Sequence, residues 1–129
     1  MESKKGNPVV WFEIYVDDMN RAARFYETVL NVKLEQMSDP TDQSMDMRSF
    51  PGNMEEFGVS GTLVKMEGMK ARGNNVTVYF GCADCAVEES RVETAGGKVV
   101  QSKMSIGEYG FCSTVQDSEG NIIGLHSMK

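Results

Sequence analysis

The 129-residue chain is poor in several kinds of residue that would point to particular functions. It has one histidine and three cysteines, and an odd cysteine count leaves at least one thiol outside any internal pair. We therefore expect a protein of the cytoplasm, where the reducing environment keeps thiols unpaired. Its uninterrupted apolar runs are too short to cross a bilayer. The opening residues, MESKKG, lack the apolar core of a signal peptide.

Positive charge is scarce as well. Thirteen Lys and Arg stand against nineteen Asp and Glu, which gives a formal net charge of -6 and a pI of about 4.8. An acidic surface repels phosphate backbones and anionic lipids, so nucleic acid and membrane surfaces are poor partners. The sequence also has no Gly-rich phosphate loop and no nucleophile elbow.

One arrangement of secondary structure occurs twice along the chain. Apolar residues alternate over a first strand, an aspartate (Asp18 or Asp84) follows as a helix N-cap, and three further strands follow the helix. The expected strands span residues 9–16, 34–37, 45–50, 59–66, 76–82, 98–104, 109–116 and 122–128, and the expected helices span 19–30 and 85–95.

This order predicts one α+β domain over residues 1–129, made of two βαβββ modules. The first module spans about residues 8–66, a linker about 67–75, and the second module about 76–128. A helix can cover only one face of each sheet, so the other faces must be covered by something else. We expect a curved eight-stranded sheet around a cleft, with the helices outside.

Several motifs resemble one family. They are WFEIYVDD at 11–18, the helix residues Ala22, Ala23 and 25–30, and the turn DSEGN at 117–121. In this order they are similar to the vicinal oxygen chelate superfamily, which includes glyoxalases, bleomycin-resistance proteins and extradiol dioxygenases. The resemblance implies paired βαβββ modules, a small-molecule site in the cleft and a homodimer.

The family's usual divalent metal has no matching ligands here. The resemblance places ligands on the first and last strands of each module, and these positions hold Trp11, Thr77 and Gly124, while residues 59–64 contain no imidazole or carboxylate. Trp and Gly cannot ligate a metal, and Thr is a poor ligand without carboxylates nearby. We therefore expect no metal and no other cofactor.

Glu13 and His126 keep a catalytic alternative open. Each lies two residues beyond a family ligand position, so strand periodicity places it on the cleft-facing side. If the two strands approach each other, Glu13 and His126 could serve as general acid and base. Glu13 could equally be a hydrogen-bonded structural carboxylate, and His126 a solvated residue near the C-terminus.

Aromatic side chains are the main candidates for binding a ligand. Trp11, Tyr15 and Tyr79 share the cleft-facing side, and Thr77 lies on the same strand face as Tyr79. They would form a stacking platform for an aromatic or amphipathic molecule, or else fill a small core. Arg48 could bind an anionic group or be a solvated edge residue. Tyr109, in the turn 107–110, could cover the ligand.

Cys82 and Cys85 have the spacing of a redox pair, but no thioredoxin pattern surrounds them, and a redox role stays open. The sequence as a whole predicts a metal-free small-molecule-binding protein of the glyoxalase and bleomycin-resistance type. The alternative is a lyase or isomerase of the glyoxalase type that uses Glu13 and His126.

Overall fold

The computed structural model describes residues 6–39, 44–71 and 75–129. The N-terminal residues 1–5, a predicted strand break at Pro40 and the central part of the predicted linker (72–74) lie outside the described residues. The chain divides into two compact units, Trp11–Val76 and Thr77–Lys129 with the first ten residues. No helix in the described part of the chain is long and apolar enough to cross a membrane.

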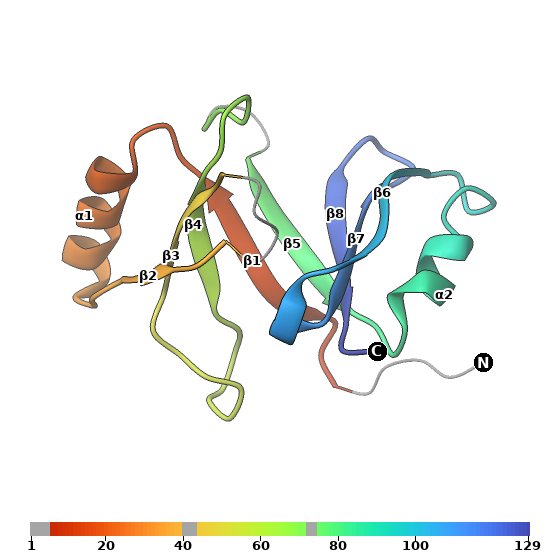
Figure 1. The fold of residues 1–129 in the computed structure, drawn as a ribbon, viewed down its shortest axis with the longest axis horizontal. Coiled ribbons are helices and arrows are strands. Elements are labelled where there is room, and N and C mark those ends of the chain that lie inside the picture. The colour runs from red at the N-terminus through yellow and green to blue at the C-terminus, as the bar shows by residue number, and fades with distance from the viewer. Residues whose placement is uncertain (1–5, 40–43, 72–74) are drawn as a thin grey trace. The chain divides into compact units, whose positions relative to one another are not determined.

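The N-terminal module contains β1 to β4 and one helix (Figure 1). Its elements are β1 (Val9–Tyr15), α1 (Met19–Leu30), β2 (Glu35–Met37), β3 (Asp46–Ser49) and β4 (Gly61–Lys65). The strand order is β2-β3-β4-β1. The β1 and β4 strands are parallel, whereas the other two pairs are antiparallel.

The ends of α1 are fixed by the residues that the sequence indicates. Asp18 has an extended backbone, and its carboxylate accepts the N–H of Arg21 at 3.0 Å. This hydrogen bond satisfies one of the N–H groups that a helix start leaves unpaired. Asn31 ends the helix in the left-handed conformation, with φ 53°. The predicted bounds of this helix are confirmed.

The core of the N-terminal module lies between α1 and one face of its sheet. Ile14 of β1, Val16 just after it and Leu63 of β4 pack against Met19 and Ala23 of the helix. Of the apolar residues at helical spacing in the sequence of α1, Ala22 and Tyr26 also pack against this core.

Phe25 and Val29 remain exposed at 57% and 61% of their surface. The small Ala23 lets the helix lie close to the sheet, and the contact is centred on Met19 and Ala23, one turn apart. Phe25 and Val29 lie at the edge of the apolar stripe that is turned away from the sheet.

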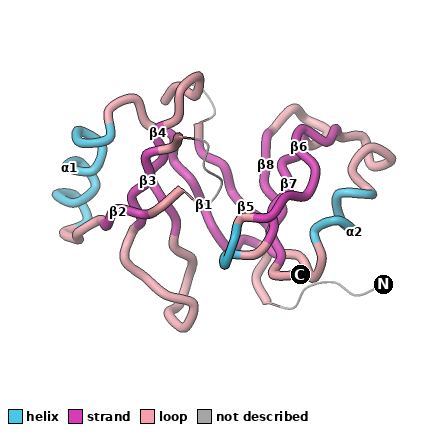
Figure 2. The backbone as a smooth tube through the Cα atoms, in the orientation of Figure 1, coloured by secondary structure: helices cyan, strands magenta, loops and turns pink. Residues whose placement is uncertain are grey.

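The C-terminal module repeats the order (Figures 1 and 2). Its elements are β5 (Val76–Gly81), α2 (Cys85–Ser90), β6 (Lys98–Ser105), a 3-10 turn η1 (Gly107–Tyr109), β7 (Phe111–Gln116) and β8 (Ile122–Ser127). The strand order is β5-β8-β7-β6, again with the first and last strands parallel. The two βαβββ modules confirm the predicted α+β class, and the cleft between them stays a prediction.

Several element boundaries differ from the sequence prediction, and two of these differences have a clear physical reason. The α2 helix ends at Ser90 rather than Ala95, because Arg91 and Val92 donate to carbonyls three residues back and the chain continues as turns. Strand β7 begins at Phe111 rather than Tyr109. Gly110 has φ 101°, and a Cβ there would lie 2.4 Å from the carbonyl oxygen of Ser127, so this close approach requires glycine.

Candidate functional site

Strand register places several predicted site residues on the face of the N-terminal sheet that α1 does not cover. Ile14 pairs with Leu63, and both pack toward α1. Glu13 pairs with Thr62, and Thr62 pairs in turn with Ser49. Successive strand residues point to opposite faces, so these three lie on the other face, which we call the open face.

Glu13 and Tyr15 are joined on the open face. The Tyr15 hydroxyl donates to Glu13 Oε1 at 3.1 Å, between side chains two residues apart on β1. A charge-assisted hydrogen bond of this kind holds the carboxylate in one orientation. The open face therefore carries an oriented carboxylate beside a phenol, and alternation on the strand places Trp11 on the same side.

Sequence reasoning did not single out Thr62. Its side chain is fully buried, and its Oγ1 has no hydrogen-bond partner among the described residues. Leaving a buried hydroxyl unpaired costs roughly 1–3 kcal/mol. Thr62 pairs with Glu13 as Gly124 pairs with Tyr79, so it holds in β4 the place that Gly124 holds in β8. The repeated order of strands in the two modules was the available signal.

Arg48 lies on the opposite face from Glu13. It pairs with Leu63 across β3 and β4, and its Nη2 donates to Asn20 Oδ1 of α1 at 2.9 Å. The helix start thus takes up the planar donor group that could have met an anion on the open face. A ligand-binding role for Arg48 stays a prediction, and it would act on the side of the sheet that faces the helix.

Thr77, Tyr79 and His126 share the open face of the C-terminal sheet, because Phe80 and Leu125 pack toward α2. The Tyr79 ring lies directly over Gly124. A Cβ built on Gly124 would lie 2.2 Å from Tyr79 Cδ2 and 2.3 Å from Cε2. The ring therefore occupies the space that a side chain at position 124 would need.

His126 is a half-buried residue of β8 rather than part of a solvated tail. Its Nε2 donates to the backbone carbonyl of Tyr109 at 2.7 Å. This bond leaves Nδ1 as the acceptor of the neutral ring. The Tyr109 side chain, in η1, is 42% exposed. Glu13 and His126 belong to different modules, and the expectation that their side chains lie close to each other stays a prediction.

The donors at the family's ligand positions do not fit a divalent metal. The four places hold Trp11, Thr62, Thr77 and Gly124, and the Tyr79 ring fills the space over the last. Two hydroxyls without a carboxylate or imidazole are a weak donor set for zinc, iron or manganese. Across residues 6–39, 44–71 and 75–129, no three His, Cys, Asp or Glu side chains group in a way that could hold a metal.

Cys82 and Cys85 are both buried in the C-terminal module, and neither forms a disulfide. Burial, followed by the nearby Glu88 carboxylate, raises the pKa of the Cys82 thiol to about 11. Since the thiolate is the reactive form, this raised pKa disfavours reaction of Cys82 near neutral pH. The two cysteines that have redox spacing thus belong to the buried core of the C-terminal module.

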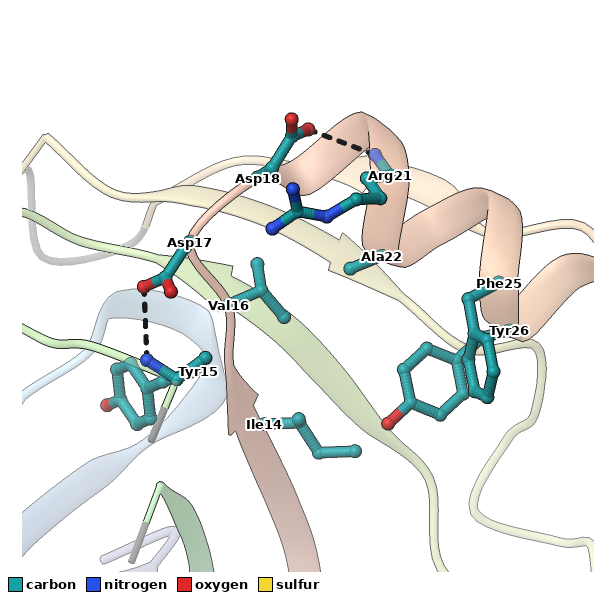
Figure 3. A pocket seen from close by; sticks show the side chains of 10 residues that line it. Ile14, Tyr15, Val16, Asp17, Asp18, Arg21, Ala22, Phe25 and Tyr26 are labelled. Atoms are coloured by element: carbon teal, nitrogen blue, oxygen red, sulfur yellow. Dashed lines mark hydrogen bonds between the residues drawn. The ribbon is translucent and has the colours of Figure 1, made fainter. Parts of the chain in front are cut away.

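An open hollow of about 430 Å³ lies at the carboxyl end of β1, beside α1 (Figure 3). Its apolar lining comes from Ile14 of β1, from Val16 just after this strand, and from Ala22, Phe25 and Tyr26 of α1. The rest of its wall is formed by Tyr15, Asp17, Asp18, Arg21 and Ala71. Ile14 and Val16 point toward α1, so most of the hollow lies on the helix side of the sheet, and Tyr15 is the one open-face residue that also lines it.

Comparison with known proteins assigns the chain to one family. The model of the Glyoxalase/Bleomycin resistance protein/Dioxygenase superfamily matches residues 9–125. No curated protein has a significantly similar sequence.

Several solved structures share the fold. Methylmalonyl-CoA epimerase of Mycobacterium tuberculosis has 16% identity and a TM-score of 0.68, over 95% of this chain and 88% of that chain. Methylmalonyl-CoA epimerase of Streptomyces coelicolor, in complex with 2-nitronate-propionyl-CoA, has 14% identity and a TM-score of 0.66, over 93% and 96%. A hypothetical protein of Bacillus halodurans has 15% identity and a TM-score of 0.73, over 97% and 96%.

Proposed function

Because the chain belongs to the Glyoxalase/Bleomycin resistance protein/Dioxygenase superfamily, we propose that it binds a small aromatic or amphipathic molecule without the divalent metal typical of that superfamily. The observation that carries this proposal is the Tyr79 ring over Gly124. At a position where the family keeps a metal ligand, this chain presents an aromatic surface. An aromatic face stabilises an apolar ligand by stacking and by excluding water.

The open faces supply the other parts of such a site. Trp11 and Tyr15 add aromatic surface, and the Glu13 carboxylate, oriented by Tyr15, would accept a hydrogen bond from the ligand. Thr77, which is half-buried, is a further polar group that would orient it. Tyr109 would close the edge of the site from η1.

Fluorescence of Trp11, the only tryptophan, tests this proposal. A panel of aromatic and amphipathic molecules is titrated into the metal-free protein, and the change in emission gives each dissociation constant. Tyr79→Leu should weaken binding of a hit about fivefold, because a stacking partner contributes roughly 1 kcal/mol. The matched control Tyr79→Phe keeps the ring and should bind as the wild type does. Equal binding by the leucine variant would remove Tyr79 from the site.

The Glu13–Tyr15 hydrogen bond favours a second candidate, proton transfer by an isomerase or lyase. Methylmalonyl-CoA epimerase, whose fold the chain shares, is named for such an isomerisation. An oriented carboxylate suits a general base, and His126 would act as the partner acid. Glu13→Gln should leave ligand binding intact and abolish turnover if the protein is an enzyme. If the protein only binds, the variant should show no loss of turnover, because the wild type has none.

Two sequence expectations remain proposals. We propose that the chain works in the cytoplasm, on the ground of its odd number of unpaired cysteines. We also propose that it forms a homodimer, as the family resemblance implies. We further propose that it binds neither nucleic acid nor membrane, since its net charge of -6 repels the phosphate backbone and anionic lipids.

A further inference from the structure

Three side chains that can bind a soft metal form one row across the C-terminal sheet, whose strands β6, β7 and β8 are neighbours (Figure 1). Met104 of β6 pairs with Cys112 of β7, and Cys112 pairs in turn with His126 of β8. Side chains of direct cross-strand partners lie on the same face, with Cβ atoms about 4.5–5.5 Å apart. Since His126 lies on the open face of this sheet, the thiol and the thioether lie there beside it.

The row is accessible from outside the core. The residues that alternate with it on β7 and β8, among them Phe111 and Leu125, pack on the helix side. Met104, Cys112 and His126 are all half-buried. Cys112 thereby differs from the other two cysteines of the chain, which are buried. An ion can therefore reach this thiol without disruption of the core.

The hydrogen bond of His126 prepares its second ring nitrogen for a metal. Nε2–H donates to the Tyr109 carbonyl at 2.7 Å, so the lone pair of the neutral ring is on Nδ1. A metal-binding histidine usually donates its other N–H in this way, which fixes the orientation of the ring and raises its basicity. Tyr109 lies in η1, directly before β7, so the bond holds the ring near the end of β7 that carries Cys112.

The three donors suit a soft ion. Thiolate and thioether sulfur select Cu(I), and imidazole also binds copper. Zinc and nickel prefer sets with further thiolates, imidazoles or carboxylates. Among the described residues, no third His, Cys, Asp or Glu completes a metal-holding group with Cys112 and His126. Met104 is consequently the third donor, and its thioether favours Cu(I) over a divalent ion.

We propose that Met104, Cys112 and His126 form a Cu(I) site on the open face of the C-terminal sheet. Cys112 binds as the thiolate, and its S–H proton passes to water. Met104 Sδ and His126 Nδ1 complete a three-coordinate set, and no electron is transferred. None of the three residues occupies a ligand position of the superfamily, so this site is independent of the divalent metal of that superfamily.

Anaerobic titration of the full chain with Cu(I), against a competing Cu(I) chelator, tests the proposal. The wild type should bind one equivalent. Cys112→Ser should abolish stoichiometric binding, and Met104→Leu should weaken it by about 10–100-fold. Met54→Leu, at a methionine that is 99% exposed on another module, is the matched control and should bind as the wild type does. Circular dichroism of each metal-free variant checks its fold. No binding by the wild type, or unchanged binding by a folded Cys112→Ser, would overturn the proposal.

NMR of the wild type locates the ion without a substitution in the measured protein. In a chain labelled with ¹³C at the methionine methyls, Cu(I) should shift the Met104 resonance, assigned from the Met104→Leu spectrum, and leave that of Met54 in place. An unmoved Met104 methyl at saturation would place the ion elsewhere, such as at Cys82 and Cys85, and would overturn the proposal. Equimolar Zn²⁺ should leave Cu(I) bound, and its displacement would contradict the assignment to a soft ion.

Discussion

The ring of Tyr79 and the backbone of Gly124 are so close that a Cβ on Gly124 would lie 2.2 Å from Tyr79 Cδ2. The two residues are direct partners across the parallel strands β5 and β8. An aromatic ring and a glycine facing each other form a complementary pair, since the missing side chain makes room for the ring. The same pair occupies a place where the family resemblance implies a metal ligand.

Gly124→Ala should lower the free energy of unfolding by about 1–3 kcal/mol, because the added methyl overlaps the Tyr79 ring. Urea denaturation measures this loss. In the Tyr79→Ala background the same substitution should cost much less, and the difference is the coupling energy of the pair. Equal costs in both backgrounds would mean that the ring does not lie over residue 124.

Thr62→Val should raise the free energy of unfolding by about 1–2 kcal/mol, because it replaces a buried unpaired hydroxyl by a methyl group of similar size. The control Thr77→Val alters a half-buried threonine and should change stability little. A clear loss of stability would show that Thr62 already has a partner in the free protein.

Ser127→Ala should cost about 1–3 kcal/mol of unfolding free energy. Ser127 is 2% exposed, accepts the N–H of Cys85 at the start of α2 at 3.0 Å and donates to the carbonyl of Lys129 at 3.0 Å. Alanine leaves that N–H buried and unpaired. Ser90→Ala, at an exposed serine that bonds only its own helix, is the control and should be nearly neutral in thermal melts. Similar losses in both variants would argue against the special role of Ser127.

Asp84 predicts a specific pH dependence. The hydrogen bond from Lys103, at 2.9 Å, and that from the Ala86 N–H hold the pKa of this carboxyl below its usual value. A folded-state pKa below the unfolded one stabilises the fold above the unfolded value, about 4, and this stabilisation is lost as the pH falls through the folded value.

Asp84→Asn keeps the helix cap but removes the titrating group, so stability should depend less steeply on pH in the acid range. Urea denaturation at a series of acid pH values measures the slope. Asp117, whose pKa is lowered by hydrogen bonds from Asn121, should maintain part of the dependence in both proteins. An unchanged slope in the variant would exclude Asp84 as a source of it.

The sequence predicts best those features that depend on local contacts. Asp18 and Asp84 are helix caps in the structure because each carboxylate bonds an N–H only two or three residues away. The strand alternation that places Ile14 toward the helix and Glu13 on the open face is likewise local. Such features need no knowledge of the tertiary fold.

Contacts between residues far apart in the sequence account for what the sequence prediction missed or got wrong. The apolar pattern of α1 indicates that Ala22 and Tyr26 pack, but the exposure of Phe25 and Val29 depends on how the helix fits against the sheet. The burial of Thr62 depends on its pairing between β1 and β3. Arg48 meets Asn20 from 28 residues away, so the sequence does not show that α1 takes up its guanidinium.

Metal retention is the most direct test of the account. The purified protein is dialysed against zinc, nickel, iron and manganese in turn, then against buffer, and the bound metal is measured by elemental analysis. With Trp11, Thr62, Thr77 and Gly124 at the family's ligand positions, no metal should remain at a stoichiometric level. One equivalent of tightly held metal per chain would contradict the proposal of a metal-free aromatic binding site.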